Sequence, residues 1–126
     1  MIDISDGVKL FNSEYYFESH DYFEDLWIKA EHDERLFFQG MVQMSVGCYH
    51  HSHKNYKGAL SQFTRGSEKL KLYGEKHNGV NLGKLLAEVE PIKTELERFF
   101  RGEVEELKEY SYPVLEYITE NSKKEK

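Results

Sequence analysis

The sequence predicts an all-α protein, a single compact bundle of five to six helices over residues 1–120. Apolar residues recur at intervals of three and four along most of the chain, which is the period of an amphipathic helix. No alternating apolar and polar stretch is long enough to build a sheet, so we expect none. The 126 residues suit one domain, because two would have about 60 residues each and marginal cores. Residues 121–126 read as a frayed tail.

Two helices are predicted within the first 30 residues. Ser5 can cap a short helix over 6–11, and Asn12 or Ser13 can cap a second helix over 14–30. The second helix carries an apolar row with helical spacing: Tyr16, Phe23, Trp27 and Ala30.

The third and fourth helices follow from two further caps. Asp33 can cap a helix over 34–50, which is apolar on much of its circumference and is therefore expected to be the central, most buried helix. Asn55 can cap a helix over 56–73, and the glycine-bounded stretch 74–79 ends it.

A fifth helix is predicted to begin after Asn81, which can cap it. Pro91 falls inside its apolar pattern and lacks a backbone donor, so we expect a kink or a restart of the helix there. Val104 and Leu107 indicate a further amphipathic turn or two, and residues 110–118 read as an aromatic strap.

Charge is unevenly distributed along this acidic chain, whose net charge is −6. Residues 1–35 hold 10 acidic and 3 basic side chains, whereas residues 36–84 hold 2 and 7. The basic segment either faces phosphate or packs between acidic segments that neutralise it. The overall acidity, with no basic run interleaved with aromatic residues, argues against a nucleic-acid partner.

Composition also bears on location. No apolar run approaches about 18 residues and no secretory signal is recognisable, so we expect no membrane span and no export. The single Cys48 cannot form an intrachain disulfide, and it lies on an apolar row as a small buried hydrophobe. We expect a cytoplasmic monomer or small homo-oligomer.

The candidate site consists of polar residues on otherwise apolar helix faces. His20, Glu24 and Trp27 share one face of the second helix. A second stripe on the third helix, with Asn55 beside its end, completes the candidate cluster: Gln39, Gln43 and His50. We expect the stripes to face each other, with the Glu24 carboxylate bonded to Gln43, His50 or a nearby backbone group, beside a largely buried Trp27.

Several chemistries fit this cluster. It can be a hydrogen-bonded network that fixes helix register, a pocket for a small polar ligand, or an acid/base pair of His20 and Glu24. His20, Glu24 and His50 can also ligate a metal, although the paired motifs of a di-iron bundle are missing. No cofactor is indicated. His51 and His53 read as ordinary solvated histidines at a helix end.

Three ordered motifs resemble a known family. They are FNSEYYFESHDYFEDLW, LFFQGMVQMSVGCYHH and NYKGAL, within about residues 10–75. They resemble the bacterial and archaeal domain of unknown function 309 family, and the matching positions are Asn12, Phe17, Glu18, His20, Glu24, Trp27, Gln39, Gly40, Gln43, His50, Asn55, Gly58 and Ala59. Asp21 stands where the family more often has Glu. The resemblance implies an all-helical cytosolic protein and assigns no activity.

Two functional hypotheses remain. The first is a small helical binding or interaction module that recognises an unidentified small polar ligand or a protein. The second is a small metal- or acid/base-dependent enzyme centred on His20, Glu24 and His50.

Overall fold

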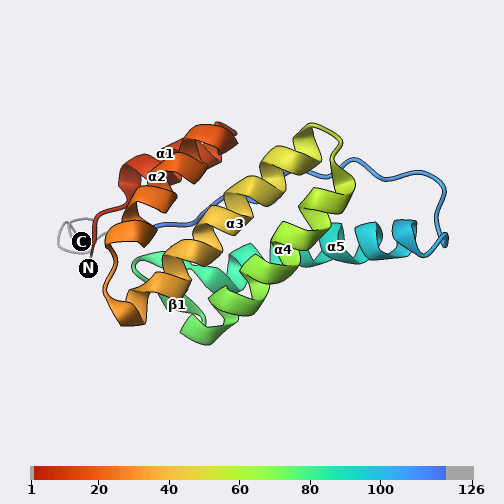
Figure 1. Ribbon diagram of the computed structural model, residues 1–126. Coiled ribbons are helices and arrows are strands. Elements are labelled where there is room, and N and C mark those ends of the chain that lie inside the picture. The colour runs from red at the N-terminus through yellow and green to blue at the C-terminus, as the bar shows by residue number, and fades with distance from the viewer. Residues whose placement is uncertain (1, 119–126) are drawn as a thin grey trace.

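The structure, a computed structural model, describes residues 2–118 and is 68% helical, which confirms the all-α prediction. It contains five α-helices: α1 (Ser5–Asn12), α2 (Tyr16–Lys29), α3 (Arg35–Ser52), α4 (Tyr56–Leu70) and α5 (Leu82–Phe100) (Figure 1). Short 3₁₀ turns at His32–Glu34 and Lys71–Tyr73 precede α3 and follow α4.

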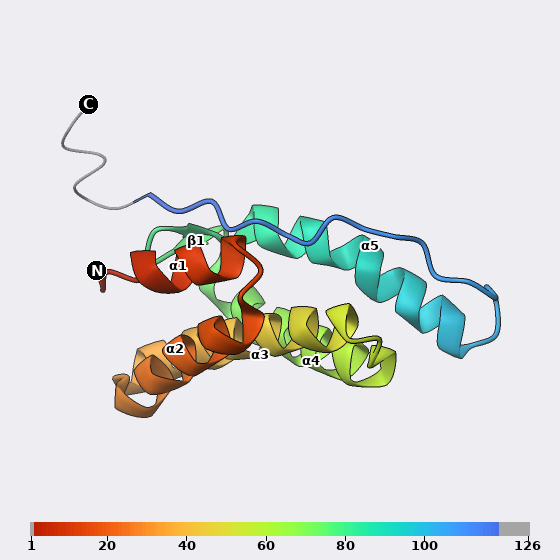
Figure 2. The same ribbon diagram turned by 90° about the horizontal axis from the view of Figure 1, so that it is seen from above.

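The helices form two layers (Figure 2). Helices α2, α3 and α4 lie side by side in one layer, while α1 and α5 form the other. Helix α3 packs against both α2 and α4, which confirms its predicted central place. Two glycines let α4 approach: a Cβ at Gly40 would lie 2.8 Å from Leu70, and one at Gly47 would lie 2.6 Å from the Phe63 ring.

One contiguous hydrophobic core joins the layers, from Ile4 to Leu115. Its largest fully buried side chains are phenylalanines: Phe11, Phe23, Phe37, Phe38 and Phe63. Each aromatic side chain removes a large apolar area from water, so these residues dominate the hydrophobic stabilisation of the fold.

Two of the predicted helix caps are confirmed. The side-chain oxygen of Asn55 accepts a hydrogen bond from the Gly58 amide (3.0 Å), and that of Asn81 accepts one from the Lys84 amide (3.0 Å). The other expected caps are wrong. At the starts of α1, α2 and α3, the cap positions are Ile4, Tyr15 and Glu34, none with a side-chain cap bond.

The expectation of no sheet is also wrong, because a small hairpin precedes α5. Strand β1 (Lys76–His77) pairs antiparallel with β2 (Val80–Asn81). The two residues between them, Asn78 and Gly79, have φ angles of 48° and 82°. An Asn-Gly pair with positive φ at both positions is the preferred two-residue hairpin turn.

Helix α5 continues through Pro91 without a restart, which was one of the two outcomes expected there. The segment after α5 differs from its prediction, because residues 103–118 contain no helix where a further amphipathic turn or two was expected. Gly102, with a φ of 75°, ends the helix by turning the chain back. We call residues 103–118 the strap. The predicted tail at 121–126 lies outside the described residues.

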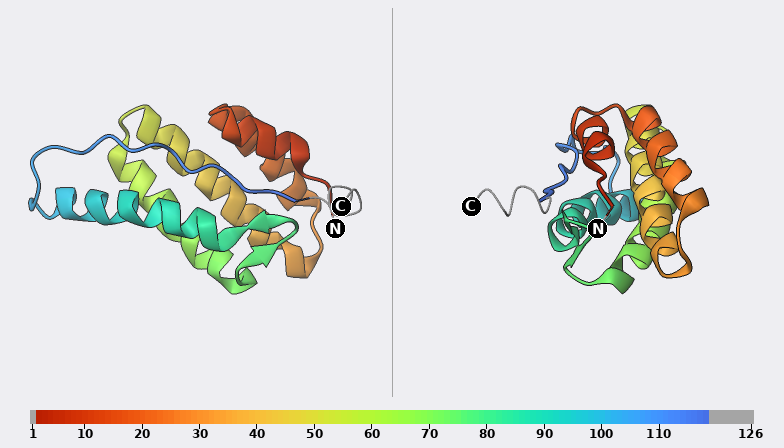
Figure 3. Two further views of the ribbon diagram at one scale, coloured as in Figure 1. Left: turned by 180° about the vertical axis from the view of Figure 1, so that it is seen from behind. Right: turned by 90° about the vertical axis from the view of Figure 1, so that its left-hand side faces the viewer.

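The strap runs between α1 and α5 (Figure 3). Asn12 both accepts from the Leu115 amide (2.7 Å) and donates to the Leu115 carbonyl (3.0 Å). Glu88 of α5 accepts from the Val114 amide (3.1 Å). Beyond them, the Ile118 amide donates to the Gly79 carbonyl (2.9 Å), which adds the strap to the hairpin edge. Side chains therefore supply most of these backbone partners.

Among the described residues, none of the helices has both the length and the apolar character needed to cross a bilayer.

Candidate functional site

A groove between α2 and α3 brings together two of the predicted site residues, His20 and His50. It is a cavity of about 180 Å³ with almost entirely apolar walls. The residues that line it come from the start of α2 and the last turns of α3: Tyr16, Phe17, His20, Val46, Tyr49 and His50. The helices run antiparallel, so these two ends meet at the same level of the layer.

His20 is held by oxygen atoms on both sides of its ring. Its Nε2 lies 3.2 Å from a carboxylate oxygen of Glu24, one turn later on α2. Its Nδ1 lies 3.3 Å from the Phe17 carbonyl and 3.3 Å from the Asp21 carboxylate. Both ring nitrogens of His20 therefore face oxygen atoms of the protein.

Asn55 determines which ring nitrogen of neutral His50 carries the proton. The Asn55 side-chain oxygen is used as the helix cap, so its amide nitrogen is the atom that faces His50 Nδ1, at 3.3 Å. An amide nitrogen can only donate, which makes Nδ1 the acceptor and places the proton of neutral His50 on Nε2. Gly58 permits this arrangement, since a Cβ there would lie 2.9 Å from the His50 ring.

Tyr16 contributes a buried polar group next to the groove. Its side chain is only 4% exposed, and its hydroxyl finds no hydrogen-bond partner among the described residues. Burial, and then the neighbouring Cys48, raise the pKa of the phenol above its ordinary value. Its ring packs edge-on against Tyr112 of the strap (5.7 Å). The phenol is therefore neutral and, among the described residues, without a hydrogen-bond partner, which is a local cost to stability.

The two predicted polar stripes meet only at the groove, where His20 and His50 lie, and not along their length. Glu24 bonds to His20 on its own helix, while Gln43 accepts from the Lys69 ammonium of α4 (2.9 Å). The expected bond from Glu24 to Gln43 or His50 is therefore not formed in the described structure. Gln39 is half-buried, one turn before Gln43.

Trp27 is half-buried, which corrects the expectation that it is largely buried. It lies at the edge of the layer, with the Arg35 guanidinium 5.5 Å from its ring centre. A cation over an indole face is attracted by the ring quadrupole. Trp27 therefore belongs to the far end of the α2–α3 pair and does not line the groove.

Two polar contacts that sequence reasoning missed join neighbouring elements. Ser19 and Ser45 form a buried hydroxyl pair (2.7 Å) between α2 and α3. His51, expected to be solvated, lies 2.8 Å through Nδ1 from the Tyr112 hydroxyl of the strap. Burial lowers the pKa of His51 and, with nearby charges and polar groups, raises that of Tyr112 to about 12. Neutral His51 thus accepts from Tyr112.

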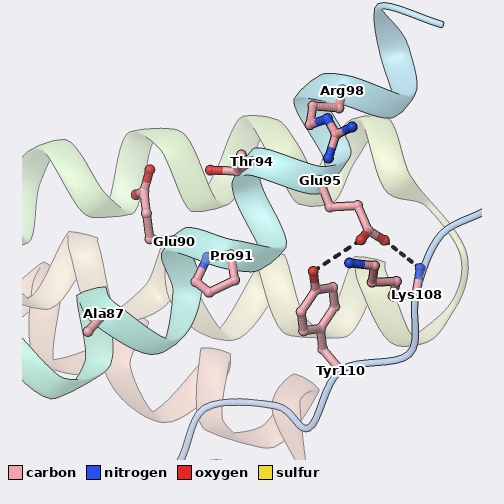
Figure 4. A pocket seen from close by; sticks show the side chains of 8 residues that line it. All are labelled: Ala87, Glu90, Pro91, Thr94, Glu95, Arg98, Lys108 and Tyr110. Atoms are coloured by element: carbon pink, nitrogen blue, oxygen red, sulfur yellow. Dashed lines mark hydrogen bonds between the residues drawn. The ribbon is translucent and has the colours of Figure 1, made fainter. Parts of the chain in front are cut away.

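A larger hollow of about 470 Å³ lies between α5 and the strap (Figure 4). Its buried acid, Glu95, accepts from the Lys108 backbone amide and from the Tyr110 hydroxyl (3.0 Å). Because both carboxylate oxygens are already engaged by the strap, we assign Glu95 an anchoring role. The α2–α3 groove is the better candidate site.

Reactive and metal-binding groups are limited in the described residues. Cys48 is fully buried, as predicted, and burial raises the pKa of its thiol, which disfavours the nucleophilic thiolate. Across residues 2–118, no three His, Cys, Asp or Glu side chains are grouped closely enough to hold a metal ion. The set His20, Glu24 and His50 is thus not assembled as a three-ligand site.

Comparison with known proteins bears on this groove. No curated protein and no solved structure matches the chain. The model of one family, described as "Domain of unknown function (DUF309)", matches residues 4–62. That segment runs from the start of α1 into α4, and it contains all six groove residues but none of the strap. Over residues 4–62 the chain is therefore similar to the domain of unknown function 309 family, as its motifs indicate.

Proposed function

We propose that this chain is a small cytoplasmic binding module whose α2–α3 groove takes a small aromatic molecule with one hydrogen-bond acceptor. The observation that carries the proposal is the placement of His20 and His50 around one apolar cavity of about 180 Å³. The buried, unbridged Cys48 agrees with a reducing compartment.

The walls of the groove define the body of the ligand. Phe17 is 52% exposed although it is a large apolar side chain, and its ring lies 5.9 Å from that of Tyr49. The cavity is smaller than the roughly 300–1,000 Å³ of most drug-sized sites. A single aromatic ring with one substituent suits this volume and would remove the exposed ring of Phe17 from water.

The histidines define the polar end of the ligand. His50 carries its proton on Nε2, because Asn55 occupies Nδ1, and no described residue bonds to that Nε2. A donor beside an apolar wall favours an acceptor such as a carboxylate oxygen. The ring nitrogens of His20 already contact Glu24 and Asp21, so His20 serves as a wall of the groove and not as a hydrogen-bond donor to the ligand.

Benzoate tests the proposal, with benzylamine as a probe of similar size that lacks the acceptor. Two-dimensional amide NMR during titration should show benzoate shifting the signals of Val46, Tyr49 and His50, with a dissociation constant in about the millimolar range expected for a fragment. Benzylamine should leave those signals in place. Scattered shifts without saturation would contradict the proposal.

Two variants locate the binding. Val46→Phe fills the groove and should abolish the benzoate shifts, whereas Val42→Phe is the matched control, one turn earlier on α3 and outside the groove. His50→Phe should weaken benzoate binding at least several-fold by removing the donor. If Val42→Phe and Val46→Phe behave alike, the ligand binds elsewhere.

Acid/base catalysis is the second candidate, favoured by the contact between His20 and Glu24. A carboxylate beside an imidazole can orient the ring for proton transfer. In this chain both nitrogens of His20 already face oxygen atoms, so the arrangement supports binding better than proton transfer. Turnover of a bound ester or amide that His20→Gln abolishes, without loss of binding, would favour the enzyme.

A further inference from the structure

The acidic segments of the chain do not neutralise its basic middle segment. Residues 36–84 contain seven Lys and Arg, and only Lys84 forms an ion pair with a described residue, Glu88 on the same helix. Lys69 donates to the neutral amide of Gln43. The other five are exposed: Lys54, Lys57, Arg65, Lys71 and Lys76.

Three of these cations form a stripe along α4. Lys54 lies in the turn before the helix, and Lys57 and Arg65 follow on its outward side, within about 80° of the helix circumference at 100° per residue. We call Lys54, Lys57 and Arg65 the basic stripe. Lys54 and Arg65 are 11 residues apart, or about 16 Å at 1.5 Å per residue. Glu68, one turn further, is the only acidic residue on this side of α4.

Helix α2 carries a stripe of opposite charge and equal length. Its members are all exposed and recur at intervals of four, three and four residues: Glu14, Glu18, Asp21 and Asp25. Glu14 and Asp25 are also 11 residues apart, and Glu14 lies in the turn before α2 as Lys54 does before α4. Apart from the contact of Asp21 with His20, these carboxylates form no ion pair with a described residue. We call them the acidic stripe.

The two stripes cannot meet within one molecule. Helix α3 lies between α2 and α4, so the outward sides of α2 and α4 face opposite directions (Figure 1). Two molecules side by side would bring the acidic stripe of one against the basic stripe of the other. We propose that the basic stripe is a docking surface for the acidic stripe of a second copy of this chain.

The register of the stripes fits this contact. With the two helices parallel, Glu14 meets Lys54 and Asp25 meets Arg65, while Glu18 falls within one residue of Lys57. Asp21 falls opposite Ser61, a hydroxyl that can donate to it.

The geometry also sets the kind of assembly and its strength. The contact joins two different surfaces, so each added copy leaves one stripe of each sign open, and the copies form open chains instead of closed dimers. Exposed ion pairs are individually weak, about 0–1 kcal/mol, and are screened by salt. The association is therefore reversible and most evident at high protein concentration.

Sedimentation velocity across protein concentration and salt is the first test. At about 0.1 M salt, where the screening length is about 10 Å, the weight-average mass should rise above the 14.9 kDa of one chain as concentration increases. At about 1 M salt, where that length is about 3 Å, it should return to one chain. A mass of one chain at every salt and concentration would overturn the proposal.

Charge reversal supplies the sharper test. The α4 variant, Lys57→Glu with Arg65→Glu, puts acidic residues into the basic stripe and leaves the acidic stripe intact. The α2 variant, Glu18→Lys with Asp25→Lys, puts basic residues into the acidic stripe and leaves the basic stripe intact. All four residues are exposed, so both variants should keep the wild-type helical circular dichroism spectrum. Each variant alone should stay monomeric. An equimolar mixture should associate, because the acidic stripe of the α4 variant can bind the basic stripe of the α2 variant.

Glu105→Lys with Glu106→Lys is the matched control. It changes the net charge as much as the α2 variant does, at exposed strap positions outside both stripes. It should associate as the wild type does. A mixture of the reversed variants that remains monomeric would overturn the proposal. So would a wild type that stays monomeric yet binds a DNA oligonucleotide through Lys57 and Arg65, because the basic stripe would then serve a nucleic acid.

Discussion

The layer of α2, α3 and α4 is held by apolar packing, whereas the strap is attached to the layer of α1 and α5 largely by hydrogen bonds from side chains. In the first, glycines at 40 and 47 let α4 approach α3, and apolar side chains such as Phe63 fill the contact. In the second, polar side chains bind backbone groups of the strap, with Asn12, Glu88 and Glu95 as the main partners. An apolar contact tolerates substitution by another apolar side chain of similar volume, whereas a hydrogen bond is lost when its one partner is removed. A substitution in the first layer should therefore destabilise the whole domain, whereas one at a strap contact should loosen only the strap.

The largest effect is expected for Phe63→Ala. Phe63 is fully buried and touches the position of Gly47, so its removal leaves a cavity between α3 and α4. We expect a loss of about 3–5 kcal/mol in the free energy of unfolding, measured by urea denaturation. The amides of both layers should lose hydrogen-exchange protection together. Loss confined to α4 would show that the three-helix layer is not one cooperative unit.

Glu95→Ala probes the second layer and should cost less. It leaves the Lys108 amide and the Tyr110 hydroxyl without their acceptor, a penalty of about 1–3 kcal/mol. Hydrogen exchange should accelerate in the strap while amides of α3 stay protected. Glu97→Ala is the control, because that residue is exposed on the same helix. Equal loss of protection in α3 would contradict the proposed division.

Trp27→Ala should have a smaller effect still. Trp27 is half-buried and lies over Arg35 at the edge of the first layer, so we expect about 1–2 kcal/mol, below the 3–5 kcal/mol of a fully buried tryptophan. As Trp27 is the only tryptophan, native fluorescence should be partly quenchable by iodide. Emission that resists quenching completely would show that the side chain is deeply buried.

The smallest effect concerns pH. Burial lowers the pKa of His51 below 6.5, so the unfolded chain binds the proton more readily than the folded one. Stability from this residue is therefore fully present above pH 6.5 and is lost as pH falls through the lower folded pKa. Urea midpoints measured between pH 7.5 and 5 should fall less steeply in His51→Gln. An identical slope in both proteins would show that His51 does not link the layers.

Helix periodicity predicts most of the first layer. The spacing of apolar residues places α2, α3 and α4 to within a few residues, and Asn55 begins α4 through the cap that its short amide can form. These signals are local, since both partners lie within one turn of a helix.

The contacts of the second layer are harder to predict, because the residues that form them lie far apart in the sequence. Asn12 resembles a helix cap, yet its partner is Leu115, and Glu95 finds its partners only once the strap folds back. No local pattern encodes either contact. The hairpin is different, because Asn78-Gly79 is a recognisable turn signal that an all-helical reading overlooks.

The candidate site was predictable in part. Spacing shows that Gln43 and His50 share a face of α3, but it does not show which neighbour that face meets at each level. Gln43 lies toward α4 and bonds to Lys69, whereas His50 borders α2. The aromatic walls of the groove at Phe17 and Tyr49 were not predicted, because the spacing within one helix does not show which side chains border a groove between two helices.

The pairing of Asn12 with Leu115 has a consequence for how the protein is made. A ribosome adds about 5–20 residues each second, so the 103 residues that separate the two take about 5–20 s to synthesise. During that interval α2, α3 and α4 can already pack together, while Asn12 still lacks its backbone partner. Once the strap has emerged, it can bond both to Asn12 of α1 and to Glu88 and Glu95 of α5. Helix α1 can pack against α2 early, and its bonds to the strap are thus among the last contacts to form.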